Sequence, residues 1–171
     1  YEKGAFTGAN KTTPGKIEIA QDGTLFLDEI GDMPIGLQAK MLRFLQERVI
    51  ERVGGRSEIP INIRVICATH RDIPTMVADQ TFREDLFYRV GEISIIIPPL
   101  RERDNDVVLL AKTFLAQYNN EFKTKLKGFS DSAIKAMKQH KWPGNIRELQ
   151  NKLKSAVIMA EGSLIQAEDL G

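Results

Sequence analysis

The stretch TLFLDE, residues 24–29, decides the fold class, because a short apolar strand ends there in two carboxylates. Such a strand places its last side chains at the carboxyl edge of a sheet, where ligands of α/β folds usually bind. In that position Asp28 could hold Mg²⁺ through water, and Glu29 could orient an attacking water in phosphoryl transfer. A buried strand that simply ends in an acidic cap is the alternative interpretation.

Helical and turn patterns surround this strand. Apolar residues spaced three and four apart predict a helix over about residues 34–47, and FREDLFYRV, residues 82–90, predicts a short one. VIERVGGRSEIPI, residues 49–61, indicates a hairpin that turns on its two central glycines. The buried stripe of the longer helix is predicted to consist of Leu37, Met41, Leu42 and Leu45.

Three further stretches are predicted to be strands. They are KIEI at residues 16–19, RVICATH at 64–70, which ends in Thr69 and His70, and EISIIIPPL at 92–100. Continuous apolar strands between helical segments indicate a parallel sheet that is covered on both faces. The expected architecture is therefore α/β.

The pattern becomes purely helical beyond residue 103. Ser130 is placed to cap the second of three expected helices, and Asn145 and Glu148 have the spacing of a capping box at the start of the third. Trp142 is expected to be a core aromatic. The composition change near PPLRERDND predicts two domains, an α/β domain over 1–103 and a helical domain over 104–171.

Composition indicates a globular protein: 42% of the residues are hydrophobic, 27% are charged and the net charge is +1. No apolar run approaches a membrane span and no signal peptide is present, so we expect a cytoplasmic protein without membrane partners. The single cysteine, Cys67, is expected to be a buried structural residue. Nine Lys or Arg lie within residues 123–154, where they could meet nucleic acid or form a solvated helical face.

Three arginines are candidates for phosphate binding, because a planar guanidinium suits phosphate oxygens. Arg83 and Arg89 lie six residues apart in FREDLFYRV, where surface ion pairs are the alternative. Arg147 follows the chain break WPGN, one turn inside a helix, and could reach a nucleotide phosphate. The two histidines show neither metal-ligand spacing nor a Ser-His-Asp set, and they are expected to be structural or solvated.

GAFTGA, residues 4–9, holds an aromatic residue and a threonine between glycines. Ordering glycine costs more backbone entropy than ordering any other residue. A loop that exposes Phe6 and Thr7 on such a backbone usually exists to touch something.

Taken together, these stretches resemble the AAA+ domain of bacterial sigma-54-dependent transcriptional activators, also called enhancer-binding proteins. The resemblance covers nearly the whole chain, and several motifs in one order are far more specific than any one alone. In chain order the motifs are GAFTGA, GTLFLDEIGDMP, LQAKMLRFLQE, RVICATH, FREDLFYR, PPLRER and WPGNIREL. The resemblance implies a P-loop-NTPase-type parallel sheet followed by a small helical lid.

The resemblance also implies roles for individual residues. Asp28 and Glu29 match the Walker B pair, for Mg²⁺ and for the hydrolytic water, and Thr69 and His70 match sensor I, where many members have Asn in place of the histidine. Arg147 matches sensor II. Arg83 and Arg89 match arginine fingers that reach the nucleotide of a neighbouring subunit, which implies a ring, usually a hexamer. The implied contact with the sigma-54 subunit of RNA polymerase is made by Gly4, Ala5, Phe6, Thr7, Gly8 and Ala9.

In the family, ATP binding and hydrolysis move this loop, and the movement remodels a closed promoter complex into an open one. The chain contains no G-x-x-x-x-G-K-[ST] motif to cradle phosphates, and the near match around Gly15-Lys16 lacks the first glycine and the hydroxyl. That motif lies N-terminal to GAFTGA in the family. We therefore expect this chain to begin partway through the domain, to lack the first central strand, to bind Mg-ATP weakly or not at all, and to hydrolyse none by itself.

Two further expectations concern partners. A missing central strand leaves a sheet edge that invites pairing between copies of the chain. Promoter-upstream DNA would be bound through a C-terminal domain that is absent here, and two-component regulation is compatible with the family. The alternatives are a helix-turn-helix module at 129–160 that binds nucleic acid through its lysines, and an adaptor that has lost its ATPase activity.

Overall fold

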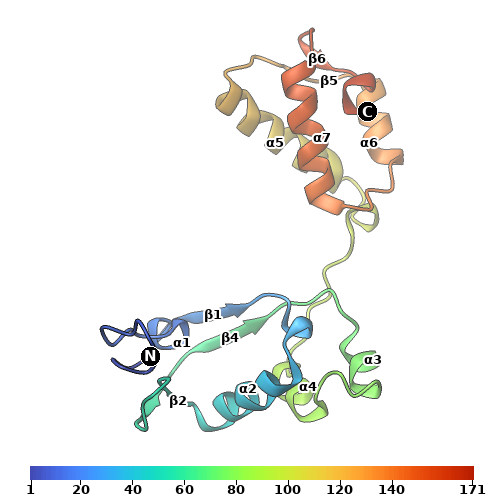
Figure 1. Ribbon diagram of the computed structural model, residues 1–171. Helices are drawn as coiled ribbons and strands as arrows, with labels where there is room; N and C mark the ends of the chain where they lie inside the picture. The colour runs from blue at the N-terminus through green and yellow to red at the C-terminus, as the bar shows by residue number, and fades with distance from the viewer. The chain divides into compact units, whose positions relative to one another are not determined.

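The computed structural model describes residues 1–171 and divides them into two compact units, Tyr1–Ile95 and Ile96–Gly171. The first unit is α/β and the second is almost entirely helical (Figure 1). The short 3₁₀ turn η2, Leu100–Glu102, belongs to the second unit, because Leu100 lies in its core and donates its N–H to Asn145 Oδ1 at 2.8 Å. The composition change near residue 104 lies just beyond this turn.

The first unit is built on two parallel strands with helices packed against them. β1 and β4 lie side by side, with Leu27 paired to Cys67 at their ends, and β2 and β3 form the predicted hairpin. The strands are β1 (Thr24–Leu27), β2 (Val49–Glu51), β3 (Glu58–Pro60) and β4 (Arg64–Cys67). The helical elements are α1 (Lys16–Ile19), η1 (Ile30–Asp32), α2 (Ile35–Glu47), α3 (Ile73–Ala78) and α4 (Glu84–Val90).

The expectation that helices cover both faces of the sheet is wrong for this structure. Alternate residues of the strands face the core formed with α2, α3 and α4, whereas Phe26 and Ile66 lie on the other face and are 58% and 41% exposed. The two strands and the helices are shown in Figure 1. The continuous apolar pattern suggested burial on both sides. Only one face of the two strands therefore has packed partners. Cys67 lies on that face but is half-buried, not fully buried as predicted.

Two predicted strands are also wrong. Residues 16–19 form α1, in which Ile19 N–H donates to Gly15 O at 3.0 Å and the helical turn brings Glu18 to Arg52. Residues 92–97 form no strand, and their four isoleucines are exposed. β-branched composition favours an extended chain, but a strand also needs a hydrogen-bonded neighbour, and this segment has none.

The buried stripe of α2 agrees with the prediction at Met41 and Leu45 and differs from it at its first position. Leu37 is 50% exposed, whereas Gln38 is completely buried together with Met41, Phe44 and Leu45. The helix boundaries agree with the sequence, but the spacing rule favoured the more apolar of two neighbouring residues. A buried glutamine has to find hydrogen-bond partners, which makes its surroundings informative.

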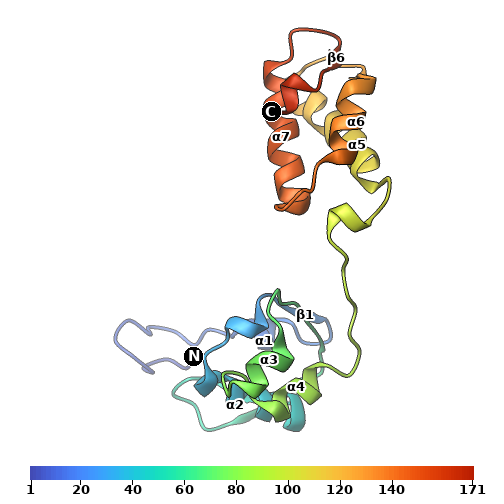
Figure 2. The same cartoon turned by 90° about the vertical axis from the view of Figure 1, so that its right-hand side faces the viewer.

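The second unit is a bundle of three helices joined by a short parallel ladder (Figure 2). Its elements are α5 (Asp106–Phe122), β5 (Gly128–Phe129), α6 (Asp131–Gln139), α7 (Asn145–Met159), β6 (Leu164–Ile165) and η3 (Glu168–Leu170). Buried residues from all three helices form one core, and Trp142 lies in it and donates its indole N–H to Met137 O at 2.8 Å. None of the helices is long and apolar enough to cross a membrane.

Helix caps in the second unit follow the sequence in part. Ser130 caps α6 as predicted, since its hydroxyl accepts the Ala133 N–H at 3.2 Å. Asn145 does not cap α7, because its side chain is bound to Leu100. Glu148 still fulfils half of the expected capping box: it accepts the N–H of Gly144, the residue before the helix, at 2.8 Å.

Candidate functional site

The carboxyl ends of β1 and β4 form the candidate site. Backbone pairing continues past both strands, because Ala68 N–H donates to Leu27 O at 2.9 Å and Ile30 N–H donates to Ala68 O at 3.0 Å. This extension brings the residues that follow the two strands to the same edge. Glu29 and His70, which are 41 positions apart in the sequence, become direct neighbours.

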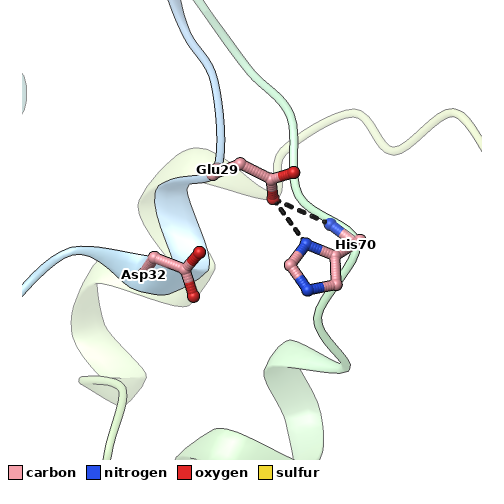
Figure 3. A group of neighbouring side chains, drawn as sticks. All are labelled: Glu29, Asp32 and His70. Atoms are coloured by element: carbon pink, nitrogen blue, oxygen red, sulfur yellow. Dashed lines mark hydrogen bonds and ion pairs between the residues drawn. The ribbon is translucent and has the colours of Figure 1, made fainter.

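Glu29 and His70 are joined by two hydrogen bonds (Figure 3). Glu29 Oε2 lies 2.7 Å from His70 Nδ1 and accepts the His70 backbone N–H at 3.3 Å. These bonds, with that of the imidazole first, hold the pKa of the Glu29 carboxyl below its ordinary value. The carboxylate is therefore anionic at neutral pH, and its other oxygen, Oε1, makes no hydrogen bond.

The backbone at Glu29 adopts an uncommon conformation that directs this side chain. Its φ of 52° and ψ of 49° are left-handed, which is rare for a residue other than glycine, asparagine or aspartate. Asp28 supports the turn, since its Oδ1 accepts the Glu29 N–H at 3.1 Å. Residues held in such conformations are concentrated at functional sites, so the turn is consistent with a working role for Glu29.

Close packing fixes the distance between the two chain segments. A Cβ added to Gly31, in η1, would lie 2.7 Å from Thr69 Oγ1 and 2.9 Å from Arg71 Cγ. Thr69 Oγ1 in turn accepts the Arg71 N–H at 3.0 Å, and Arg71 Nε donates to Asp32 Oδ1 at 3.1 Å. The absence of a side chain at residue 31 is therefore what lets Thr69 and His70 lie against the end of β1.

Sequence spacing did not reveal that a histidine joins this carboxylate group. Ligand atoms of Glu29, Asp32 and His70 all lie within 4.8 Å of one another, and the three side chains are exposed (Figure 3). Asp32 already forms an exposed ion pair with Arg71. The only sequence hint of this pairing is that Glu29 and His70 each follow a predicted strand. Spacing within one segment cannot show a contact between two segments.

Arg83 lies just before α4 and Arg89 lies in its last turn, and both side chains are partly exposed. Arg83 forms two hydrogen bonds with Asp85, at 2.9 and 2.6 Å, and this pairing lowers the pKa of the Asp85 carboxyl. Arg89 donates to Glu92 Oε1 at 3.0 Å and to Leu45 O, near the end of α2, at 3.1 Å. Surface ion pairs, the alternative interpretation of these arginines, are thus present, and each guanidinium still reaches solvent.

The loop over residues 4–9 is a compact turn with an exposed tip. Gly4 N–H donates to Ala9 O at 2.8 Å and closes the loop, and Ala9 is buried. Phe6 is 53% exposed, and its ring lies 5.0 Å from the Tyr1 ring in an edge-to-face contact. Thr7 and Gly8 are also exposed, so the loop presents its tip to solvent.

An arginine anchors the base of this loop, and sequence reasoning did not single it out. Arg52 lies just after β2 and is bound both to Glu2, which precedes the loop, and to Glu18 in α1. Glu2 N–H also donates to Val53 O at 3.0 Å. Hydrogen bonds from Arg52 lower the pKa values of both carboxyl groups. The hairpin therefore holds the loop by charge and by backbone pairing.

Arg147 lies in the other unit, as the third residue of α7. It is exposed and forms neither an ion pair nor a hydrogen bond in the structure. Buried Leu149 and Leu153 hold the opposite face of α7 in the core. The helix therefore presents a free guanidinium near its first turn, as the sequence predicts.

Known protein families match both units of the chain. Residues 1–96 match the family described as the sigma-54 interaction domain, and residues 101–171 match the AAA+ ATPase lid domain. The regulatory protein AtoC of Escherichia coli is 51% identical over 170 residues, which are 99% of this chain and 37% of AtoC. The alginate biosynthesis transcriptional regulatory protein AlgB of Pseudomonas aeruginosa is 46% identical over all of this chain and 38% of its own length.

A solved structure has the same fold. NtrX from Brucella abortus, crystallised in complex with ATP, superimposes with a TM-score of 0.85 at 35% identity, over 92% of this chain and 36% of NtrX. This chain thus spans well under half the length of the relatives that it matches. The family matches and the structural likeness together establish that the chain belongs to the sigma-54 interaction domain family, with an AAA+ core followed by an AAA+ lid.

Proposed function

We propose that this chain serves an ATP-driven activator of transcription that acts on sigma-54 RNA polymerase. The observation that carries the proposal is the shared edge of β1 and β4, where Glu29 is oriented by His70 at 2.7 Å. The ATP in the NtrX crystals and the family's description as a sigma-54 interaction domain support it. The lid match over residues 101–171 favours a lid over a helix-turn-helix module at 129–160.

The side chains at this edge fit the chemistry of nucleotide hydrolysis. Asp28 is an exposed carboxylate that would hold Mg²⁺ through water, and the ion would neutralise phosphate charge. Glu29 is anionic and has one oxygen without a hydrogen bond, so it can orient a water and accept its proton. His70 keeps that carboxylate in place, and the Thr69 hydroxyl is exposed beside it.

The arginines would supply positive charge where phosphate charge spreads during transfer. We assign Arg147 to the nucleotide of its own subunit, and Arg83 and Arg89 to the nucleotide of a neighbouring subunit in a ring. Their ion pairs with Asp85 and Glu92 are partly exposed, and exposed pairs of this kind are worth little, so they exchange readily for a phosphate. The loop over 4–9 would contact sigma-54 through Phe6 and Thr7.

Open-complex formation tests this function in the complete protein that carries the chain. Purified activator, sigma-54 polymerase, ATP and promoter DNA are mixed, and permanganate reactivity reports melted DNA. We expect Glu29→Gln to lower the kcat of ATP hydrolysis by about 10²–10⁴-fold, because the group that activates water is lost. Phe6→Ala should retain hydrolysis and lose open complexes.

A matched control separates the loop contact from a general loss of apolar surface. Leu37 is exposed to nearly the same extent as Phe6, and it lies on α2 away from the loop. Leu37→Ala should leave both hydrolysis and open complexes unchanged. Open complexes at the wild-type rate with Phe6→Ala would rule out the role given to the loop, and full hydrolysis by Glu29→Gln would rule out the catalytic assignment.

A further inference from the structure

Gln38 is the one polar side chain that is fully buried in this chain, and it lies in the first turn of α2. Burying a carboxamide is unfavourable unless its donors and acceptor are all satisfied. The site described above does not include this residue. Its three hydrogen bonds therefore need an explanation beyond the packing of α2.

All three bonds go to backbone groups of two other segments. Gln38 Nε2 donates to Met33 O at 2.8 Å and to Thr81 O at 3.2 Å, and its Oε1 accepts the Arg83 N–H at 2.8 Å. Met33 lies in the short connection from η1, which directly follows Glu29. Thr81 and Arg83 lie in the connection from α3 to α4. One side chain thus joins the segment after Glu29 to the segment that carries Arg83.

The hydrogen bond from the Arg83 N–H to Gln38 fixes the position of the Arg83 backbone, because the surrounding residues leave that N–H no other partner. Arg83 is the residue immediately before α4, and its N–H is not used by that helix. Phe82 and Leu86 on either side are buried in the core and fix the depth of the segment. Packing of Phe82 and Leu86 fixes how deep the segment lies, and the directional hydrogen bond from the Arg83 N–H to Gln38 adds an orientation to it.

A second tie lies at the other end of α4. Arg89 Nη2 donates to Leu45 O, two turns after Gln38 on α2, and Arg89 lies nearly two turns after Arg83. Both arginines are therefore hydrogen-bonded to α2, and the two bonds are about two helical turns apart on each helix. Helix α2 in turn begins just after the turn that presents Glu29.

We propose that Gln38 is a positioning residue that sets Arg83 relative to the carboxylates of its own subunit, so that Arg83 reaches the neighbouring subunit's nucleotide. The proposal rests on the function proposed above, in which Arg83 acts across a subunit boundary. Gln38 touches no reacting atom. Its effect is expected in catalysis by the neighbouring subunit and not in its own.

The first test is ATP hydrolysis by the complete protein with Gln38→Met, which keeps the side-chain length and removes all three hydrogen bonds. A displaced positive charge weakens transition-state stabilisation, so kcat should fall by about 10²-fold with little change in the KM for ATP. Gln46→Met is the control, because Gln46 lies on the exposed face of the same helix. Gln38→Asn keeps the amide on a side chain one methylene shorter, and its kcat should lie between those of Gln38→Met and Gln46→Met.

The second test mixes subunits and separates positioning from damage to the fold. A Glu29→Gln subunit has intact arginines but no working site, whereas Arg83→Ala has a working site but no finger for its neighbour. Random 1:1 mixing in a head-to-tail ring pairs an intact site with an intact finger at about one interface in four. Hydrolysis should therefore recover to about a quarter of the wild-type rate.

Gln38→Met mixed with Glu29→Gln should recover to the same extent, because its own site is intact and only its finger is displaced. Recovery with Arg83→Ala but none with Gln38→Met would overturn the role of Gln38 and leave the proposed function standing. No recovery with Arg83→Ala would overturn the arrangement across subunits, and the role of Gln38 with it. If Gln38→Met does not fold, Gln38→Asn gives the same readout.

Discussion

Alanine at Gly31 should separate the two segments that form the candidate site. The added Cβ would lie 2.7 Å from Thr69 Oγ1, whereas ordinary contacts begin at 3.4 Å. Either η1 or the segment over 69–71 must therefore retreat by about 0.7 Å, the difference between these distances. Overpacking of this kind costs about 1–3 kcal/mol of the free energy of unfolding.

The same displacement should weaken the pairing of Glu29 with His70. The His70 N–H already lies 3.3 Å from Glu29 Oε2, so a further separation would break this bond and lengthen the one to Nδ1. Because these bonds lower the Glu29 pKa, that pKa should rise toward its ordinary value in Gly31→Ala. Carboxyl ¹³C NMR titration measures it directly.

Urea unfolding followed through amide resonances of residues 1–95 measures stability, and it reads this unit separately from the helical one. Gly36→Ala is the control, because a Cβ there meets nothing within 4 Å and the residue lies in α2. Alanine is the better helix former, so this variant should gain up to about 1 kcal/mol. If Gly31→Ala were as stable as the wild type with an unchanged Glu29 pKa, the close contact inferred here would be wrong.

Four further outcomes are expected. Arg52→Met should move acid unfolding of the first unit to higher pH. The pKa values of Glu2 and Glu18 are lowered in the folded chain, so their contribution is present above the ordinary value of 4.5 and is lost as pH falls through the folded values; circular dichroism against pH checks this. Ser130→Ala should lower the free energy of unfolding of the helical unit by about 1 kcal/mol, as measured by thermal unfolding. Ser155→Ala, at an exposed serine, should not lower it. Calorimetry should find only weak binding of Mg-ATP to the 171-residue chain, since it contains no phosphate-cradling motif, and micromolar affinity would contradict this. Sedimentation should show self-association through the two-stranded sheet, and a stable monomer at high concentration would count against it.

Local sequence signals predicted the elements whose stability depends on neighbouring residues. The helices α2, α4 and α5–α7 follow apolar spacing, the hairpin of β2 and β3 follows its glycine pair, and Ser130 caps α6 as a local rule requires. The two acidic residues after β1 and the polar pair after β4 were identified from the ends of apolar strands. Their roles in hydrolysis stay predictions until they are measured.

Signals that depend on a partner segment were misjudged or missed. Residues 92–97 have strand composition but no neighbouring strand, and residues 16–19 form a helical turn in which Glu18 pairs with Arg52. The Asn145 side chain accepts the Leu100 N–H and therefore does not cap its own helix. In each case, the presence or absence of a contact distant in sequence outweighed a local preference of about 1 kcal/mol or less.

The amino-acid sequence by itself predicted helices α2 and α4–α7, the glycine turn of the hairpin, a division into an α/β part and a helical part, and the family to which the chain belongs. It gave the wrong conformation for α1 and no signal for α3. Periodicity and motif order are properties of neighbouring residues, so they can be read without coordinates. Only the tertiary structure decided that Glu29 lies against His70, that Gly31 must lack a side chain, and that Gln38 joins the segments of Glu29 and Arg83. These contacts link residues about 40 or more positions apart or depend on angstrom-scale packing, and no periodicity encodes them.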